Sequence, residues 1–209
     1  MASKSSKTPH FEATALTLNR GGKRIWENAS WSIQGYTALL GANGAGKSST
    51  LTLLAGQLSP DAGSLAFRIE GKEVAPEAWM RKVTLAAPWL ALPSHLTLSQ
   101  ALSFHSAFRS PRQGELSWGC LIESSGLSVH QEAPMHTWSS GQKQRLHLAL
   151  ALGTDSPVVL LDEPASNLDA QAIQWLHEAV AQVAAVSTLV VATNDPAKEA
   201  PGQPALLEV

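Results

Sequence analysis

The sequence predicts an α/β fold with a mostly parallel sheet, and three segments support this prediction. A glycine-rich loop at residues 41–49 lies between a short apolar run and a segment of helical pattern. Four consecutive aliphatic residues at 158–161 lead directly into two carboxylates. Another aliphatic run, at 188–192, follows a predicted helix at 169–184. Unbroken aliphatic runs are typical of strands that are buried on both faces, as they are in parallel sheets.

The N-terminal segment predicts strands joined by a tight turn. Residues 11–18 are expected to form an edge strand, and Gly21-Gly22 a hairpin turn into a second strand at 24–33. A turn at 59–64, which contains Pro, Asp and Gly, is expected to precede a further strand at 65–70.

The glycine-rich loop fits the pattern G-x-x-x-x-G-K-[ST]. In such a loop the backbone N–H groups surround a phosphate, Lys47 reaches the terminal phosphates and the hydroxyl of Ser48 ligates Mg²⁺. A strand at 36–40 precedes the loop and a helix at 47–55 follows it, so that the dipole of the helix favours bound anions. The sequence therefore predicts a nucleoside triphosphate site. Its expected binding residues are Gly41, Asn43, Gly44, Ala45, Gly46, Lys47, Ser48 and Ser49.

The middle of the chain predicts mostly helices. A short strand is expected at 83–87, and from 97 to about 127 the pattern is helical, with interruptions at Pro111 and Gly114. A further helix is expected from Gln142 to Leu152, because a glycine follows directly.

The aliphatic run at 158–161 is bounded by prolines and delivers two carboxylates at its C-terminal end. That edge is where open α/β sheets bind ligands. Asp162 is expected to hold Mg²⁺ together with Ser48, and Glu163 to orient or deprotonate an attacking water. A buried strand that ends in a solvated acidic turn is the alternative interpretation.

A third motif identifies a family. Ser139-Ser140-Gly141-Gln142 opens the predicted helix that precedes the acidic strand, and Ser166-Asn167-Leu168-Asp169 follows that strand. With the glycine-rich loop, these segments resemble the ATP-binding cassette family, whose signature loop usually reads L-S-G-G-Q and whose D-loop reads S-x-L-D. The resemblance covers nearly the whole chain.

The resemblance implies an architecture. It predicts a single cassette over residues 1–209, with a P-loop NTPase core at about 11–86 and 155–209. The core would include an N-terminal antiparallel β subdomain, and a helical signature subdomain would be inserted at about 94–153. The resemblance further implies that two copies, or this chain and a homologous subunit, pair head to tail around two ATP molecules. Each ATP would lie between the glycine-rich loop of one copy and the signature residues of the other.

In that arrangement the expected signature contacts are Ser139, Ser140, Gly141 and Gln142, with Asp169 and Ser166 communicating across the dimer. Three positions depart from the family pattern. Asn194 stands where the family usually has a His that contacts the γ-phosphate, and Asn cannot carry a proton through a reaction cycle. Pro88 is assigned the position of a Gln that reaches Mg²⁺, and Ser140 that of the first signature Gly. Asn194 is counted as catalytic beside Lys47 and Glu163, and its substitution predicts a slow or partner-dependent ATPase.

Two contacts are predicted only as hypotheses. Trp89, Leu90 and Leu92 follow the segment where cassette ATPases bind a short helix of a membrane subunit, and aromatic anchors dominate such interfaces. Packing between subdomains is the alternative role for Trp89, and packing is the expected role of Trp138. For the adenine ring no aromatic residue stands at the usual place. Arg20 and Trp26 are the candidates for contact with adenine. The alternative is that neither residue contacts it.

Composition limits the possible partners. The 209 residues carry a formal net charge of −2 without a dense basic stripe, which argues against nucleic acid as a partner. The single cysteine excludes an intrachain disulfide and is expected to fill space in the core. Residues 1–10 lack the apolar core of a signal peptide, and no apolar run reaches 18 residues. We therefore expect no direct membrane insertion and a cytoplasmic protein that reaches the inner face of the membrane through its partner.

The expected function is the ATP-binding and ATP-hydrolysing subunit of a transporter. A soluble cassette regulator without a membrane partner is the main alternative, and a small-molecule phosphotransferase is a weaker one because no acceptor site or lid is predicted. The transported substrate, the direction of transport and the choice between homodimer and heterodimer stay open. Residues 20–24 resemble haem-exporter-type cassettes only faintly.

Overall fold

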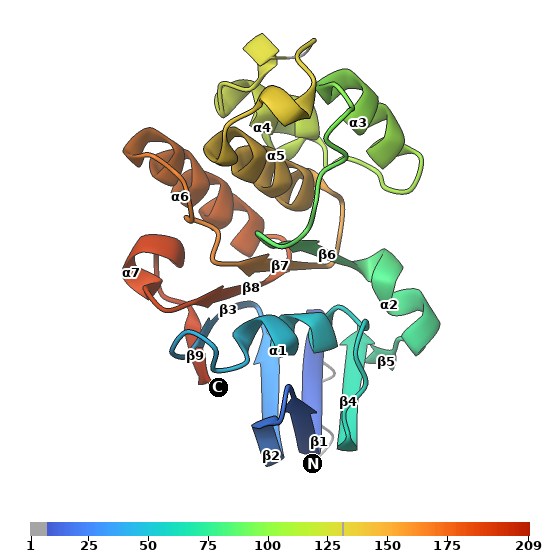
Figure 1. Ribbon diagram of the computed structural model, residues 1–209. Helices are drawn as coiled ribbons and strands as arrows, with labels where there is room; N and C mark the ends of the chain where they lie inside the picture. The colour runs from blue at the N-terminus through green and yellow to red at the C-terminus, as the bar shows by residue number, and fades with distance from the viewer. Residues whose placement is uncertain (1–7, 131) are drawn as a thin grey trace.

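The computed structural model describes residues 8–130 and 132–209. Residues 1–7, part of the segment predicted to lack a signal peptide, lie outside the described residues. Figure 1 shows an antiparallel sheet at the bottom, a second sheet across the middle and most of the helices above it. The chain alternates between the two sheets before it enters the helices above them, and it returns to the second sheet at its end.

The antiparallel sheet has four strands in the order β2-β1-β4-β5. They are β1 (His10–Arg20), β2 (Lys23–Gln34), β4 (Ala62–Ile69) and β5 (Lys72–Glu73). The predicted hairpin joins β1 to β2, and both glycines of its turn have positive φ. The predicted hairpin is confirmed.

Two predictions about this sheet are wrong. The strand over residues 11–18 is not at an edge: Phe11 pairs with Ile33 on one side and with Phe67 on the other. The strand predicted from residue 65 begins at Ala62, because the pairing with β1 extends further than the turn signals suggest. β1 is a central strand because β4 returns alongside it, and local sequence does not encode that pairing.

The second sheet has five strands, all parallel, in the order β6-β7-β8-β3-β9. They are β6 (Val83–Ala86), β7 (Val158–Asp162), β8 (Thr188–Thr193), β3 (Tyr36–Leu40) and β9 (Ala205–Glu208). The predicted parallel sheet is confirmed. β7 and β8 are buried along their whole length, which explains their unbroken aliphatic sequences.

The strand β7 separates two buried clusters. Val158 and Leu160 face a cluster that lies between the two sheets, together with the helix α1 (Lys47–Leu54). Val159 and Leu161 face the opposite cluster, which is built with helices on the other side of the sheet. Residues that alternate between two hydrophobic layers must all be apolar, so the amino acids of this strand follow directly from its position.

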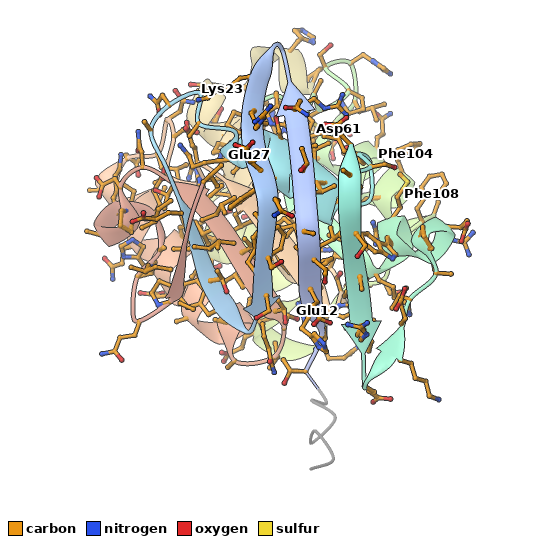
Figure 2. All side chains as sticks on the ribbon, turned by 90° about the horizontal axis from the view of Figure 1, so that it is seen from below. Glu12, Lys23, Glu27, Asp61, Phe104 and Phe108 are labelled. Atoms are coloured by element: carbon orange, nitrogen blue, oxygen red, sulfur yellow. The ribbon has the colours of Figure 1, made fainter. Side chains whose placement is uncertain are left out.

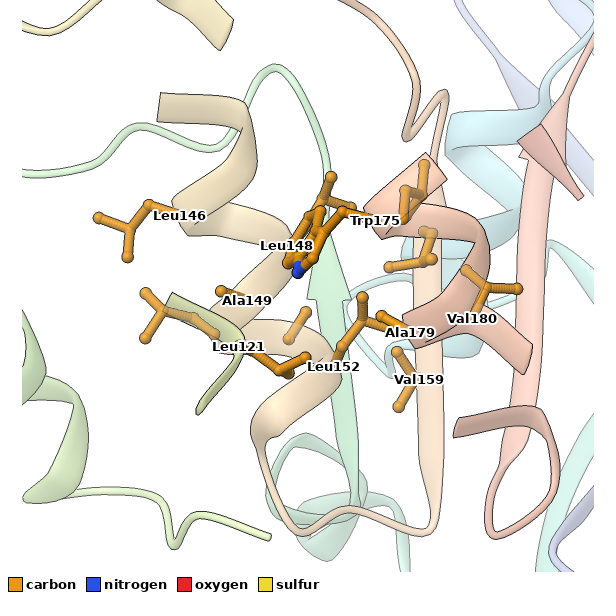
Figure 3. Packing of buried hydrophobic residues seen from close by; sticks show 14 of the residues in the cluster. Leu121, Leu146, Leu148, Ala149, Leu152, Val159, Trp175, Ala179 and Val180 are labelled. Atoms are coloured by element: carbon orange, nitrogen blue, oxygen red, sulfur yellow. The ribbon is translucent and has the colours of Figure 1, made fainter. Parts of the chain in front are cut away.

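The helices over the sheet are α3 (Leu98–Ser106), α4 (Trp118–Ser124), α5 (Ser140–Gly153) and α6 (Ala170–Ala184). Figure 3 shows α5 and α6 packed side by side, with Leu148 and Trp175 between them. The first three helices lie between β6 and β7 in the chain, where the helical pattern is predicted.

Two short helices were not predicted. They are α2 (Pro76–Lys82) and α7 (Pro196–Glu199), and each begins with a proline at its first turn. With seven and four residues they are too short to show a clear apolar periodicity. The side chain of Trp79 in α2 packs against Phe11 and Phe67, and this contact anchors the helix beside the antiparallel sheet.

Of the packing predictions for Cys120 and Trp138, the first is wrong and the second is confirmed. Cys120 is exposed on α4, so the prediction that it fills space in the core is wrong. Trp138 is buried and its indole N–H donates to the carbonyl of Ala133, which confirms its packing role. Within residues 8–130 and 132–209, no helix combines the length and apolar character that crossing a membrane requires.

Candidate nucleotide-binding site

The glycine-rich loop connects β3 to α1 at the carboxyl edge of the parallel sheet. Gly44 and Gly46 have φ values of 75° and 118°, which side chains rarely adopt. A Cβ atom on Gly46 would lie 2.4 Å from the side chain of Ile25 on β2, and one on Gly41 would lie 2.9 Å from the Cβ of Ala45. The glycines of the motif are therefore required by backbone conformation and by close contacts.

Lys47 lies inside the curve of the loop. Its side chain is buried, and its Nζ donates to the carbonyl oxygens of Gly41 at 2.7 Å and Ala42 at 3.2 Å. A second ammonium comes from Lys23 at the start of β2, whose Nζ donates to the carbonyl of Gly44 at 2.8 Å. Lys23 was not predicted, because its place at the loop depends on a hairpin that approaches from a distant part of the chain.

A pocket of about 230 Å³ lies at the glycine-rich loop, and Lys23 and Lys47 are among its lining residues. Three side chains at its wall are cationic, Arg20, Lys23 and Lys47, whereas Glu163 contributes a carboxylate. Such an excess of positive charge beside a helix N-terminus suits a polyphosphate. The lining residues are Arg20, Lys23, Ile25, Asn43, Gly44, Gly46, Lys47, Ser48, Ser49 and Glu163.

Asp162 ends β7 and is buried, with 3% of its surface exposed. Its Oδ2 accepts a hydrogen bond from the indole Nε1 of Trp89 at 3.2 Å, whereas its Oδ1 has no hydrogen-bond partner among the described residues. A buried carboxylate oxygen without a donor is unfavourable, and a cation would satisfy it. Asp162 thus fits a divalent metal ion.

Glu163 follows Asp162 with a left-handed backbone, φ 44°. Its N–H donates to the carbonyl of Ala192 on β8 at 2.9 Å, and its side chain lines the pocket. Two consecutive carboxylates therefore have different surroundings, one buried and one at the pocket wall. The unusual φ is what permits this change of direction.

Asn194 follows β8 and reaches the loop from the side of the sheet. Its Nδ2 donates to the side-chain Oδ1 of Asn43 at 3.0 Å. The structure thus brings Asn194 to the nucleotide loop, although Asn194 itself does not line the pocket formed by the described residues.

The signature residues lie elsewhere. Ser139 caps α5: its Oγ accepts from the N–H of Gln142 at 3.2 Å, and the side chain of Gln142 accepts from the N–H of Ser139 at 2.8 Å. Ser139 and Ser140 are exposed. Within the described part of the chain, the pocket at the glycine-rich loop does not include these residues or Gly141.

The D-loop lies beside the signature. A Cβ on Gly141 would lie 2.7 Å from the carbonyl oxygen of Asn167, so the two segments are in close contact. Asp169 is the N-cap of α6, and its carboxylate accepts from the N–H of Ala172 at 2.8 Å. The contact explains why Gly is needed at 141, whereas the adjacent Ser140 is exposed and tolerates a side chain.

Sequence reasoning missed a buried carboxylate, Glu199. Its Oε1 accepts from the backbone N–H of Ala165 at 3.1 Å, and its Oε2 accepts from the hydroxyl of Thr193. Burial raises the pKa of Glu199, and these two hydrogen bonds oppose that rise. Glu199 therefore connects the turn after Glu163 with the end of β8.

Two predictions about tryptophan residues need correction. Trp26 is buried, with its indole N–H donating to the hydroxyl of Thr50, so it is not available to an adenine ring. The indole of Trp89, the residue after Pro88, donates to Asp162, whereas the assignment of Pro88 to the position of the family's Gln stays a prediction. Trp89 is 50% exposed, so the core-packing alternative for it is wrong as well. Arg20 lines the pocket and stays the candidate for stacking on the adenine ring.

The order of these segments is that of one known family. The family model described as "ABC transporter" matches residues 27–166, well over half of the chain. The chain belongs to the ABC transporter family. The predicted resemblance to the ATP-binding cassette proteins is confirmed, and so is the α/β fold with a parallel P-loop core.

Two related proteins and a solved structure are similar to this chain over nearly its whole length. The cytochrome c biogenesis ATP-binding export protein CcmA of Pseudomonas syringae pv. syringae (strain B728a) is 32% identical, over 90% of this chain and 88% of the relative. The protein of the same name in Paramagnetospirillum magneticum (strain ATCC 700264 / AMB-1) is 33% identical, over 92% and 90%. A solved "ATP binding subunit of ABC transporter" has a TM-score of 0.77 and 25% identity, over 90% of this chain and 80% of that chain.

Members of the ABC transporter family hydrolyse ATP, and this chain is an ATP-binding and ATP-hydrolysing subunit of that family. The phosphotransferase alternative has no support in these comparisons.

Proposed function

We propose that this ABC subunit hydrolyses ATP between two paired cassettes and thereby drives a separate membrane subunit. The observation that carries the proposal is the pocket in which Lys47, the loop backbone and Glu163 meet. Lys47 and Lys23 neutralise phosphate charge, and Glu163 takes the proton of the attacking water. Residues 11–86 and 155–209 act as the nucleotide-binding core, and 94–153 as the helical subdomain.

The second cassette supplies signature residues to the ATP that is bound at the pocket of the first. The signature residues Ser139 to Gln142 are remote from the pocket of their own chain, yet they begin a 14-residue helix whose N-terminus favours anions. Two copies, or this chain and a homologous subunit, align head to tail so that this helix start reaches the ATP of the other. Asp169 and Ser166 lie on the D-loop beside the signature and face the same partner.

Asp162 and Ser48 are the residues that would hold Mg²⁺. The Oδ1 atom of Asp162 is buried and has no hydrogen-bond partner among the described residues, which supports this assignment. Ser48 lines the pocket at the glycine-rich loop. When bound, the metal neutralises charge on the outer phosphates. Asn194 contacts Asn43 and has no group that can exchange a proton near neutral pH, so we expect slow or partner-dependent turnover.

The proposed partner is a membrane permease subunit, so the chain would be cytoplasmic and peripheral at the inner face of the membrane. The candidate docking residues are Trp89, Leu90 and Leu92, of which Trp89 is half exposed and the two leucines are partly buried. A second exposed aromatic group was not predicted: Phe104 and Phe108 on α3 and just after it are 60% and 72% exposed. Figure 2 shows both rings at the periphery of the molecule.

The test of hydrolysis and pairing uses Glu163→Gln, which removes the proposed base and keeps the shape of the side chain. We expect kcat to fall by about a hundredfold or more, because general base catalysis contributes that much. Light scattering should show a Mg-ATP-dependent dimer of the variant. Unchanged ATPase activity in Glu163→Gln would overturn the assignment of the base, and a monomer with Mg-ATP bound would overturn the pairing.

The test of the partner is a pull-down from detergent-solubilised host membranes with tagged Glu163→Gln and Mg-ATP. We expect a multi-span membrane protein in near-equal amount. Leu90→Arg should abolish its recovery, whereas the double variant Phe104→Ser/Phe108→Ser should not. The reverse result would move docking to the phenylalanine pair. Recovery of only the tagged chain, or of a soluble complex, would favour the soluble regulator.

A further inference from the structure

We propose that Trp89 is a positioning residue for Asp162 and thereby for the divalent cation of the ATP complex. The inference rests on the proposed function, because it assigns a role at the same site. It concerns a residue that is otherwise assigned only a docking role.

The geometry of the pair is specific. Trp89 follows β6, the strand adjacent to β7, and its indole Nε1 donates to Asp162 Oδ2 at 3.2 Å. An indole is a donor only, so it can neither ligate a cation nor accept a proton. Its effect on Asp162 is to occupy one carboxylate oxygen and to leave Oδ1 for the metal, where Oδ1 has no other partner among the described residues.

The backbone around Trp89 supports a fixed orientation of the ring. Pro88 precedes it, and the N–H of Leu90 donates to the carbonyl of Ala87 at 3.1 Å, which closes a turn across the two residues. Proline restricts its own φ and the conformation of the residue before it. The ring is therefore presented to Asp162 by a constrained turn.

Trp89 differs from the buried tryptophans of the chain. Five of the seven tryptophans are less than 9% exposed and contribute to the core, namely Trp26, Trp79, Trp118, Trp138 and Trp175. Trp89 is 50% exposed, so packing in the core does not explain its position. Its hydrogen bond to a buried carboxylate does, because a charged acceptor roughly doubles the strength of the bond.

The experiment measures binding of a fluorescent ATP analogue to the full chain, with excess EDTA and in a Mg²⁺ titration. Trp89→Phe keeps the ring and removes the donor. We expect the Mg²⁺ half-saturation concentration to rise by about tenfold or more, the effect of losing a hydrogen bond to a charged group. Affinity in EDTA should stay unchanged, which a general structural defect would not allow.

The matched control is Trp175→Phe, which removes an indole hydrogen bond of 3.0 Å to Ser124 Oγ, away from the metal site. This control should leave the Mg²⁺ titration unchanged, and thermal unfolding should verify that every variant is folded. An unchanged titration in folded Trp89→Phe overturns the inference. Absence of analogue binding to the wild-type chain would instead overturn the proposed function.

A double-mutant cycle tests whether Trp89 acts through Asp162. In an Asp162→Asn background, Trp89→Phe should shift the Mg²⁺ half-saturation by less than about twofold, because residues in one hydrogen-bond network are not additive. An equal shift in both backgrounds would mean that Trp89 acts by another route and would overturn the assignment.

Discussion

The side chain of Asn194 donates a hydrogen bond to Asn43, from Nδ2 to Oδ1 at 3.0 Å. The bond joins the end of β8 to the glycine-rich loop, two segments that are 151 residues apart in the chain. The family pattern predicts an imidazole at the position of Asn194. An amide fixes the loop but does not exchange a proton during turnover, and this difference can be tested by exchanging the residue.

Asn194→His is expected to raise kcat by about tenfold, less than the usual effect of general acid–base catalysis, because the imidazole is added to a site that already has a general base. Steady-state ATPase assays with and without detergent-solubilised partner would measure it. Asn194→Ala is the control, which loses the contact with Asn43 and gains no titratable group. A lower kcat in Asn194→His than in the wild type would contradict the prediction.

Gly46→Ala is expected to weaken ATP binding by at least about tenfold, because φ 118° is strained for alanine and the new Cβ would lie 2.4 Å from Ile25. Gly44→Ala is the control: it has a positive φ of 75° but no atom within 4 Å of the new Cβ. Calorimetric titration of ATP would compare the two. If the clash matters, Ile25→Ala should partly restore binding to Gly46→Ala, and an equal loss in both glycine variants would exclude it.

Arg112→Met is expected to lower the free energy of unfolding by about 3 kcal/mol, because it leaves buried carbonyl oxygens without their donor. The buried guanidinium donates to the carbonyls of Leu152 and Ser156, both at 2.9 Å, and to the hydroxyl of Ser187 at 2.7 Å. It therefore joins the end of α5 to the starts of β7 and β8.

Urea denaturation would measure this loss. Ser187→Ala removes one acceptor of the guanidinium and is the matched variant, with an expected loss of about 1 kcal/mol. A loss for Arg112→Met no larger than for Ser187→Ala would show that water replaces the guanidinium at these carbonyls.

Glu199→Gln is expected to change how stability depends on pH. Burial raises the pKa of Glu199 in the folded state above the usual value of 4.5, and the charge of Glu163 raises it further. Between the pKa values of Glu199 in the unfolded and folded states, the folded state binds more protons. The contribution of Glu199 to the free energy of unfolding is therefore greatest at low pH and decreases as pH rises through the folded pKa. The variant should lack this fall.

Urea midpoints of the wild type and Glu199→Gln between about pH 4 and 8 would test the sign. The difference in stability between the variant and the wild type should increase in favour of the variant as pH rises. A constant difference would mean that Glu199 titrates alike in both states.

Local sequence was sufficient where one motif dictates its own geometry. The loop Gly41 to Ser49, the buried strand β7 and the helix α5 were predicted at nearly their observed bounds, because glycine-rich loops, aliphatic runs and a glycine at a helix end act over a few neighbours. The order of these motifs was also enough to predict the family.

Other features depend on segments that meet only in the folded chain. The strand over residues 11–18 was predicted at an edge of the sheet, but β4 pairs with it. Lys23, Trp89 and Glu199 belong to the site through contacts with residues that are distant in sequence. The sequence by itself determined which nucleotide chemistry is present and where its loops lie. Only the tertiary structure decided which side chains line the pocket at the glycine-rich loop and contact Asp162, because long-range packing selects those neighbours and no local pattern encodes them.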